Sequence, residues 1–115
     1  MKLRLFFTAL ATFALLAIAG AASAQDKAAV EKGKQLYATK LCSACHSIEG
    51  KGNPKGPLDN VAAKLTADEI RAWIVTPKEM TEKTKSLRKP NMGVTPGLSK
   101  ADVDALVAYM MTLKK

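Results

Sequence analysis

Two cysteines and one histidine stand together at residues 42–46, in the order C-S-A-C-H. Two cysteines three positions apart on a helical turn point the same way, so each thiol can form a thioether with one vinyl group of a haem. The imidazole of His46 can then bind the haem iron, and its second ring nitrogen requires a hydrogen-bond acceptor to fix its orientation. The pattern therefore predicts one covalently bound c-type haem, attached through Cys42 and Cys45, with His46 as the proximal iron ligand.

Three other interpretations of this segment are weaker. A C-x-x-C disulfide oxidoreductase requires a strand–helix–strand context. No stretch of the chain alternates apolar and polar residues as a strand does. A zinc site requires four ligands, whereas the chain has two Cys and one His besides its carboxylates. A structural disulfide would leave the histidine without a role. Aromatic residues make up only 5% of the chain, and a haem would supply the apolar volume that they do not.

The second axial ligand cannot be another histidine of this chain, because His46 is the only one. Of the five methionines, one begins the chain and two lie together in a helical stretch near its C-terminus. Met80 and Met92 remain, both within residues 76–98, which we expect to form a long loop. A thioether in a loop suits a low-spin haem iron. For the second axial position of the iron, the residue types leave five possibilities: Met80, Met92, a lysine, another weak ligand or an open position.

The chain has 115 residues, which allows one domain, and 48% of them are apolar, which excludes a disordered chain. Apolar residues recur at helical spacing in three stretches, which predicts an all-α fold. The first covers residues 26–40. The second begins at Thr66, which forms a capping box with Glu69, and ends before Pro77. The third begins after Ser99, a favourable N-cap. Its apolar stripe consists of Val103, Leu106, Val107, Met110 and Leu113.

Residues 25–115 resemble the small class I cytochromes c. The resemblance rests on C-x-x-C-H, on G-P-L at residues 56–58, on K-P-N-M at residues 89–92 and on A-L-V-A-Y-M at residues 105–110, within the last helix. It implies the class I cytochrome c fold, with three main helices and their loops around one covalently bound haem c.

The resemblance also assigns roles to individual residues. It implies that Pro57 and Trp73 support the haem site, with Pro57 offering its backbone carbonyl to the proximal histidine. It further implies that Gly33 and Tyr37 pack against Tyr109. The alternatives are that Pro57 is an ordinary turn residue and that Trp73 is an ordinary core residue.

The family spacing favours Met92 as the distal iron ligand. The pattern Met-x5-Leu-Ser before the last helix fits the family's distance from ligand to helix. Met80 lies 12 residues earlier, where the family frequently has a methionine that is not a ligand. The chain departs from many relatives in one respect, because Met92 is followed by Gly93 rather than by proline.

The first 24 residues read as a cleavable signal peptide. Lys2 and Arg4 form a basic start, residues 5–19 form an apolar run, and A-S-A at residues 22–24 is a small-residue cleavage site. An uncleaved membrane anchor is the alternative, since residues 5–24 are just long enough to span a bilayer. That stretch lacks an interfacial aromatic anchor and a basic flank at its end. We therefore expect export to the periplasm and no stable membrane insertion after cleavage.

The exported chain would remain basic, because removing Lys2 and Arg4 lowers the net charge only from +8 to +6. An exported protein rarely meets nucleic acid, so we expect redox partner proteins that are acidic at the docking face. Solvated surface charges are the alternative. The candidate docking residues precede Met92: Lys78, Lys83, Lys85, Arg88 and Lys89.

The sequence thus predicts a periplasmic monohaem electron carrier with His/Met iron ligation. No base, nucleophile or open metal site suggests an enzyme. One alternative is a haem c subunit of a larger oxidoreductase, such as a dehydrogenase or a sulfur-oxidising complex, which would co-purify with a larger chain. Another is a gas-binding or peroxidase-like cytochrome with an open sixth position, which would bind carbon monoxide in the untreated reduced state.

Overall fold

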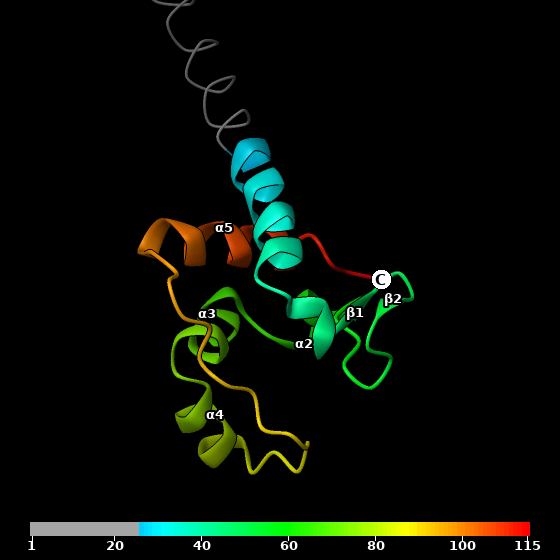
Figure 1. The fold of residues 1–115 in the computed structure, drawn as a ribbon, viewed down its shortest axis with the longest axis vertical. Coiled ribbons are helices and arrows are strands. Elements are labelled where there is room, and N and C mark those ends of the chain that lie inside the picture. Colours follow the sequence, from blue (N-terminus) through cyan, green and yellow to red (C-terminus); the bar gives the residue numbers. More distant parts are fainter. Residues whose placement is uncertain (1–25) are drawn as a thin grey trace, which may run out of the picture.

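The computed structural model describes residues 26–115, so the predicted signal peptide lies outside the described residues. Helices dominate the described chain (Figure 1), which confirms the predicted all-α class. A helix over residues 26–39, the first helix, agrees with the predicted one. The further elements are the 3-10 turn η1 (Cys42–Ala44), β1 (Ser47–Ile48), β2 (Lys51–Gly52), α2 (Val61–Lys64), α3 (Ala67–Val75), α4 (Pro77–Thr84) and α5 (Lys100–Met110).

The first helix crosses α5 (Figure 1), and Gly33 lies at the crossing. A Cβ on Gly33 would lie 2.1 Å from the carbonyl oxygen of Ala105 and 2.7 Å from the Cβ of Tyr109. One turn further on, the rings of Tyr37 and Tyr109 meet edge to face, with centroids 6.1 Å apart and planes at 76°. The predicted packing of Gly33 and Tyr37 against Tyr109 is therefore confirmed.

The hydrophobic core is centred on α5, against which α3 packs. The predicted stripe on α5 is buried from Val103 to Met110, and Leu113 is partly buried beyond the end of the helix. Each of these helices would leave its apolar side in water if it stood alone, so burial of that side holds the helices together. The buried cluster consists of Ile48, Ile70, Val103, Val107, Tyr109 and Met110.

The predicted capping box at Thr66 forms, and the predicted N-cap Ser99 is part of a second capping box. The Thr66 hydroxyl accepts from the Glu69 amide at 3.2 Å, and the Glu69 carboxylate accepts from the Thr66 amide at 2.8 Å. The Ser99 hydroxyl likewise accepts from the Asp102 amide at 3.1 Å, and the Asp102 carboxylate accepts from the Ser99 amide at 3.0 Å. Hydrogen bonds from Ser99 and from Lys32 lower the pKa of the Asp102 carboxyl to about 2. The Lys32–Asp102 ion pair, at 2.9 Å, also joins the first helix to the start of α5.

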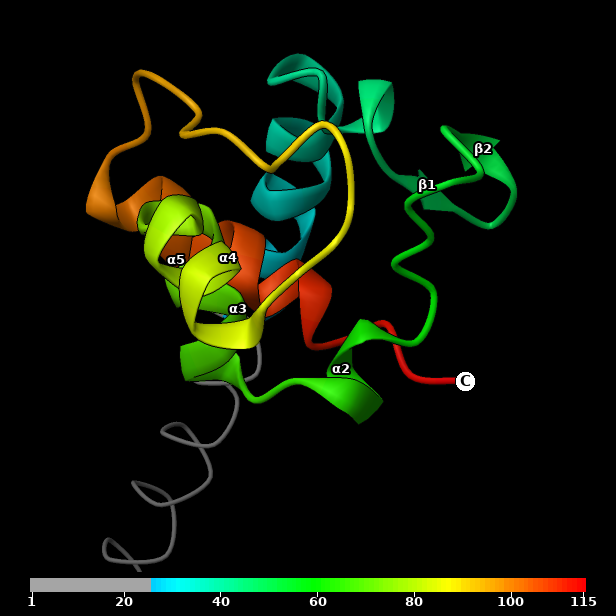
Figure 2. The ribbon, with the colours of Figure 1, turned by 90° about the horizontal axis from the view of Figure 1, so that it is seen from below.

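The prediction of an unbroken loop over residues 76–98 is wrong, because α4 occupies its first part. Pro77 ends α3, yet it also stands in the first turn of α4, where proline needs no amide partner and its fixed φ favours the helix. Glu79 adds a negative charge to that positive end. Met80 therefore lies in a helix. The irregular segment that remains, residues 85–99, is called the Met92 loop below and returns from α4 to α5 (Figure 2).

Within residues 26–115, no helix combines the length and the apolar character that crossing a bilayer requires.

Candidate functional site

A tight turn follows the first helix and carries the C-x-x-C-H pattern. Leu41 adopts a left-handed conformation, with φ 58°, which ends the helix and redirects the chain. The carbonyl of Cys42 then accepts from the amides of Cys45 and His46, at 3.2 and 3.0 Å. The turn thus places the two cysteines one turn apart, with the histidine directly after them.

The two thiols differ in their surroundings but are both free. Cys42 is half-buried and Cys45 is exposed, and neither forms a disulfide. Burial raises the pKa of the Cys42 thiol. Both sulfurs therefore remain available for thioether bonds, which is the chemistry that covalent haem attachment requires.

The imidazole of His46 is held by a backbone carbonyl, but by that of Gly56 and not that of Pro57. The distance from Nδ1 of His46 to the Gly56 oxygen is 3.1 Å. Ser47 pairs with Pro57 in a short parallel bridge: the Ser47 amide donates to the Gly56 carbonyl at 3.0 Å, and the Leu58 amide donates to the Ser47 carbonyl at 2.9 Å. This register turns the Gly56 carbonyl toward the histidine, so the expectation for Pro57 is corrected by one residue.

The hydrogen bond to Gly56 defines which ring nitrogen of His46 is free. A carbonyl can only accept, so Nδ1 carries the proton and Nε2 keeps its lone pair. Burial of the ring lowers the pKa of His46, which favours this neutral form. Neutral imidazole with one free nitrogen is the form that binds a metal. The site therefore fits a haem iron.

The backbone of His46 is fixed as well. Its carbonyl oxygen accepts from the Asn53 amide at 3.0 Å and from the Tyr37 hydroxyl at 3.2 Å. Gly52 stands at φ 109°, and a Cβ there would lie 2.2 Å from the same oxygen. Sequence reasoning missed Gly52 and Asn53 as parts of the site, because glycines in such a segment look like ordinary turn residues.

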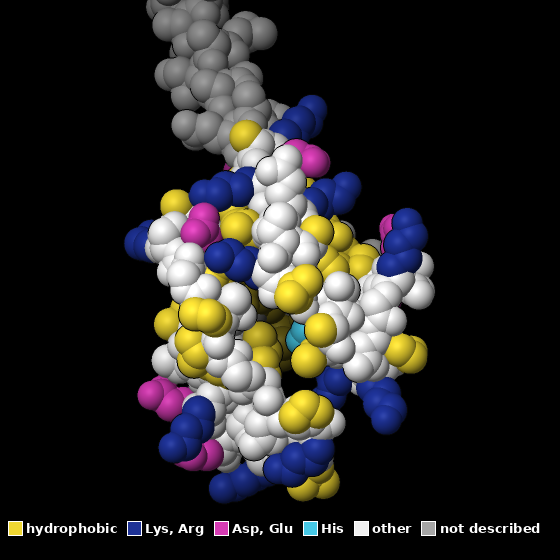
Figure 3. Space-filling model, in the orientation of Figure 1, with side chains coloured by type: hydrophobic (Ala, Val, Ile, Leu, Met, Phe, Trp, Pro, Cys, Tyr) yellow, Lys and Arg dark blue, Asp and Glu magenta, His cyan; other side chains and the backbone are white. Residues whose placement is uncertain are grey.

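Large apolar side chains are left exposed near the predicted ligands. Leu41, which precedes the first cysteine, is 71% exposed, and Leu87 and Val94, on either side of Met92, are 91% and 67% exposed. Figure 3 shows the single histidine at the bottom of a recess with a largely hydrophobic rim. A large apolar cofactor seated against these segments would cover side chains that otherwise cost free energy in water.

The structure separates the two candidate methionines. Met80 is 7% exposed and lies within α4, its amide bonded to the Thr76 carbonyl. Met92 is half-buried and lies in the irregular Met92 loop. Trp73 is half-buried on α3, outside the main buried cluster. These positions favour Met92 as the distal ligand and Met80 as a packing residue; the ligand pair itself stays a prediction.

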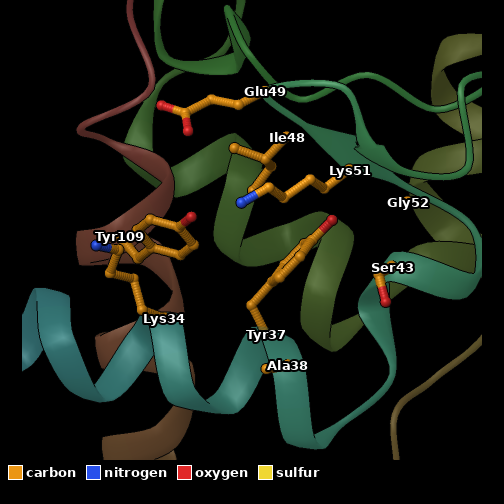
Figure 4. A pocket seen from close by; sticks show the side chains of 9 residues that line it. All are labelled: Lys34, Tyr37, Ala38, Ser43, Ile48, Glu49, Lys51, Gly52 and Tyr109. Atoms are coloured by element: carbon orange, nitrogen blue, oxygen red, sulfur yellow. The ribbon is translucent and has the colours of Figure 1, made fainter.

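A separate hollow of about 480 Å³ lies between the first helix, the β1–β2 hairpin and α5 (Figure 4). Its wall includes the facing rings of Tyr37 and Tyr109, and neither cysteine, His46 nor Met92 lines it. This hollow is therefore distinct from the recess that holds the histidine.

The basic residues predicted for docking are all exposed. Lys78 and Lys83 lie on α4, and Lys85 ends that helix. Figure 3 shows Lys and Arg side chains gathered over α4 and the adjoining loop, at the lower end of the view, together with acidic side chains. The positive charge at this end is thus mixed with negative charge, not uniform.

Comparison with known proteins places these features in a family. The sequence model of the family described as Cytochrome c matches residues 30–114. Cytochrome c-554(547) of Halothiobacillus neapolitanus is 35% identical over 91 residues, which cover 71% of this chain and 93% of that protein. Cytochrome c oxidase subunit 2 of Alkalihalophilus pseudofirmus is 30% identical over 93 residues, which cover 72% of this chain but only 25% of that longer protein. No solved structure shows significant similarity.

Proposed function

Because this chain belongs to the cytochrome c family, whose members carry covalently attached haem c and transfer electrons, we propose that it is a periplasmic monohaem electron carrier with His46 and Met92 as iron ligands. The observation that carries the proposal is the state of His46. Its Nδ1 is committed to the Gly56 carbonyl and its Nε2 is free, directly after two free thiols. Haem, when bound, supplies an Fe(II)/Fe(III) couple that takes up and releases one electron.

The chain's own residues would bind and orient this group. Cys42 and Cys45 would hold it through thioethers, and Nε2 of His46 would donate to the iron. The hydrogen bonds from Asn53 and Tyr37 fix the His46 backbone, and the Gly56 carbonyl fixes the ring. A ligand held from several sides moves little, which suits a site that must exchange electrons without rearrangement.

An absorption spectrum of the protein from the periplasmic fraction tests this proposal. We expect c-type haem bands that stay with the chain after denaturation, and a far-red band in the oxidised state that reports a methionine–iron bond. The untreated reduced protein should not bind carbon monoxide. A missing far-red band together with rapid carbon monoxide binding would instead indicate an open sixth position and a gas-binding or peroxidase-like cytochrome.

A second candidate function is a haem-carrying part of a larger oxidoreductase. The similarity to a protein named as an oxidase subunit favours this alternative, although the match covers only a quarter of that protein. The two functions differ in whether the protein stays bound to a larger chain. A free carrier purifies as a small monomer, whereas a subunit co-purifies with a larger chain at low detergent and low salt.

The predicted signal peptide gives a mass that can be checked. We expect cleavage after Ala24, because residues 22–24 offer a small-residue site, and hence a mature N-terminus at Gln25. The intact mass of the periplasmic protein should then equal that of residues 25–115 plus one haem. A membrane fraction that retains Met1 would contradict this prediction and support the anchor alternative.

Docking to an acidic redox partner predicts a steep dependence on salt. Attraction between exposed charges is screened at high ionic strength, so the association rate should fall on the order of tenfold or more as salt rises. Replacing Lys78, Lys83 and Lys85 with glutamine should lower the rate at low salt and flatten its salt dependence. Lys64→Gln, on α2, is the control. Stopped-flow electron transfer with the physiological partner measures the rate, and a rate insensitive to salt would exclude electrostatic docking.

A further inference from the structure

Arg88 differs from the other basic residues before Met92, because its side chain binds another part of the chain. Its Nη2 donates to the backbone carbonyl of Lys55, which lies 33 positions earlier. Lys55 directly precedes Gly56, whose carbonyl holds the ring of His46. This contact, the Arg88 bridge, therefore joins the Met92 loop to the segment that orients the proximal histidine.

Gly56 makes room for the bridge. A Cβ at this position would lie 2.1 Å from the Cys45 carbonyl oxygen and 2.9 Å from Nη2 of Arg88. Any side chain here would push away both the attachment turn and the guanidinium. The same residue thus supplies the carbonyl for His46 and the space in which Arg88 approaches.

The Met92 loop has few other attachments near Arg88. The Ser86 amide still bonds to the Thr81 carbonyl, but residues 87–94 make no backbone–backbone hydrogen bond within the described chain. Nζ of Lys89 donates a hydrogen bond to Oδ1 of Asn91 at 3.1 Å, but this bond is local and fixes nothing outside the loop. A segment with so few backbone bonds opens easily unless side chains hold it. Arg88 stands only four residues before Met92, so its bridge limits how far Met92 can move.

We propose that Arg88 is a positioning residue for the iron site, and that its bridge to the Lys55 carbonyl holds the Met92 loop so that Met92 stays within reach of the iron. This inference rests on the proposed His46/Met92 ligation.

Substitution of Arg88 in the holoprotein tests the bridge. Arg88→Gln removes the charge and the fork of donors, and Arg88→Lys keeps the charge but loses the planar fork. Lys83→Gln, an exposed residue in the last turn of α4, is the charge-matched control. The readout is the far-red band of the oxidised protein, followed during heating and during a rise in pH, beside the far-ultraviolet circular dichroism that reports global unfolding.

We expect the band of Arg88→Gln to disappear at a lower temperature and a lower pH than in the unmodified protein, well before the helices unfold. For Arg88→Lys, the band should disappear at a temperature and a pH between those of Arg88→Gln and of the unmodified protein. For Lys83→Gln, it should disappear under the same conditions as in the unmodified protein. Equal behaviour of Arg88→Gln and Lys83→Gln would overturn the bridge and leave the ligand proposal intact. A far-red band that is absent from the unmodified protein, or that survives Met92→Ala, would overturn the ligand proposal and the bridge with it.

Discussion

Replacing Gly33 with alanine should lower the free energy of unfolding by about 3 kcal/mol. The added Cβ would lie 2.1 Å from the Ala105 carbonyl oxygen and 2.7 Å from the Tyr109 Cβ. Both obstacles belong to α5 at or next to its backbone, so neither can rotate away and the two helices must separate. For a domain of this size such a loss lowers Tm by roughly 12–24 °C. Thermal unfolding followed by circular dichroism measures the change.

Gly93 offers a matched control for this substitution. Nothing lies within 4 Å of the Cβ that Gly93→Ala would add, and Gly93 has no left-handed φ that favours glycine. We expect that variant to stay within about 0.5 kcal/mol of the parent. If Gly33→Ala proved equally mild, the tight crossing of the first helix over α5 would not be a feature of the folded protein.

The crossing matters for the site because the first helix leads directly into the attachment turn. Tyr37 touches Tyr109 with its ring and the His46 carbonyl with its hydroxyl, so it links the crossing to the proximal histidine. Separation of the helices at Gly33 should therefore disturb the histidine segment as well as the core. The yield of holoprotein is expected to fall with stability.

Local chemistry explains why so much of the fold could be predicted from the sequence. Thr66 and Ser99 each stand three residues before an acidic side chain, and this spacing alone satisfies free amides at a helix start. The C-x-x-C-H pattern likewise places three functional groups within one turn. Such features depend on neighbours in the sequence, so the structure reproduces them.

The features that the sequence did not reveal depend on competing roles of a single residue or on contacts between residues that lie far apart in the sequence. In the sequence pattern Pro77 marks the end of a helix, but proline also favours a first turn, and this second role is what allows α4 to begin there. The carbonyl that holds His46 is shifted by one residue because a bridge between Ser47 and Pro57 sets the register. The contact of Arg88 with Lys55 spans 33 residues, and no local pattern indicates it.

Replacing Met92 with alanine is expected to have the largest effect on the redox site. Methionine ligation raises the reduction potential of a c-type haem and closes the sixth position. Its loss should lower the potential by about 0.2 V, a quarter of the range of about 0.8 V that axial ligands span. The far-red band should vanish, and the reduced protein should bind carbon monoxide. Helix content should change little, because Met92 lies in an irregular loop and is only half-buried.

Met80→Ala should show the opposite pattern, which makes the two methionines separable. The Met80 side chain is 7% exposed within α4, so its loss leaves a cavity that costs about 3 kcal/mol of stability. Its backbone bonds persist because alanine favours a helix. The potential and the far-red band should stay near those of the parent at temperatures where the variant is folded. If Met80→Ala alone lowered the potential and opened the iron to carbon monoxide, the helical methionine would be the ligand, and α4 would have to unwind to deliver it.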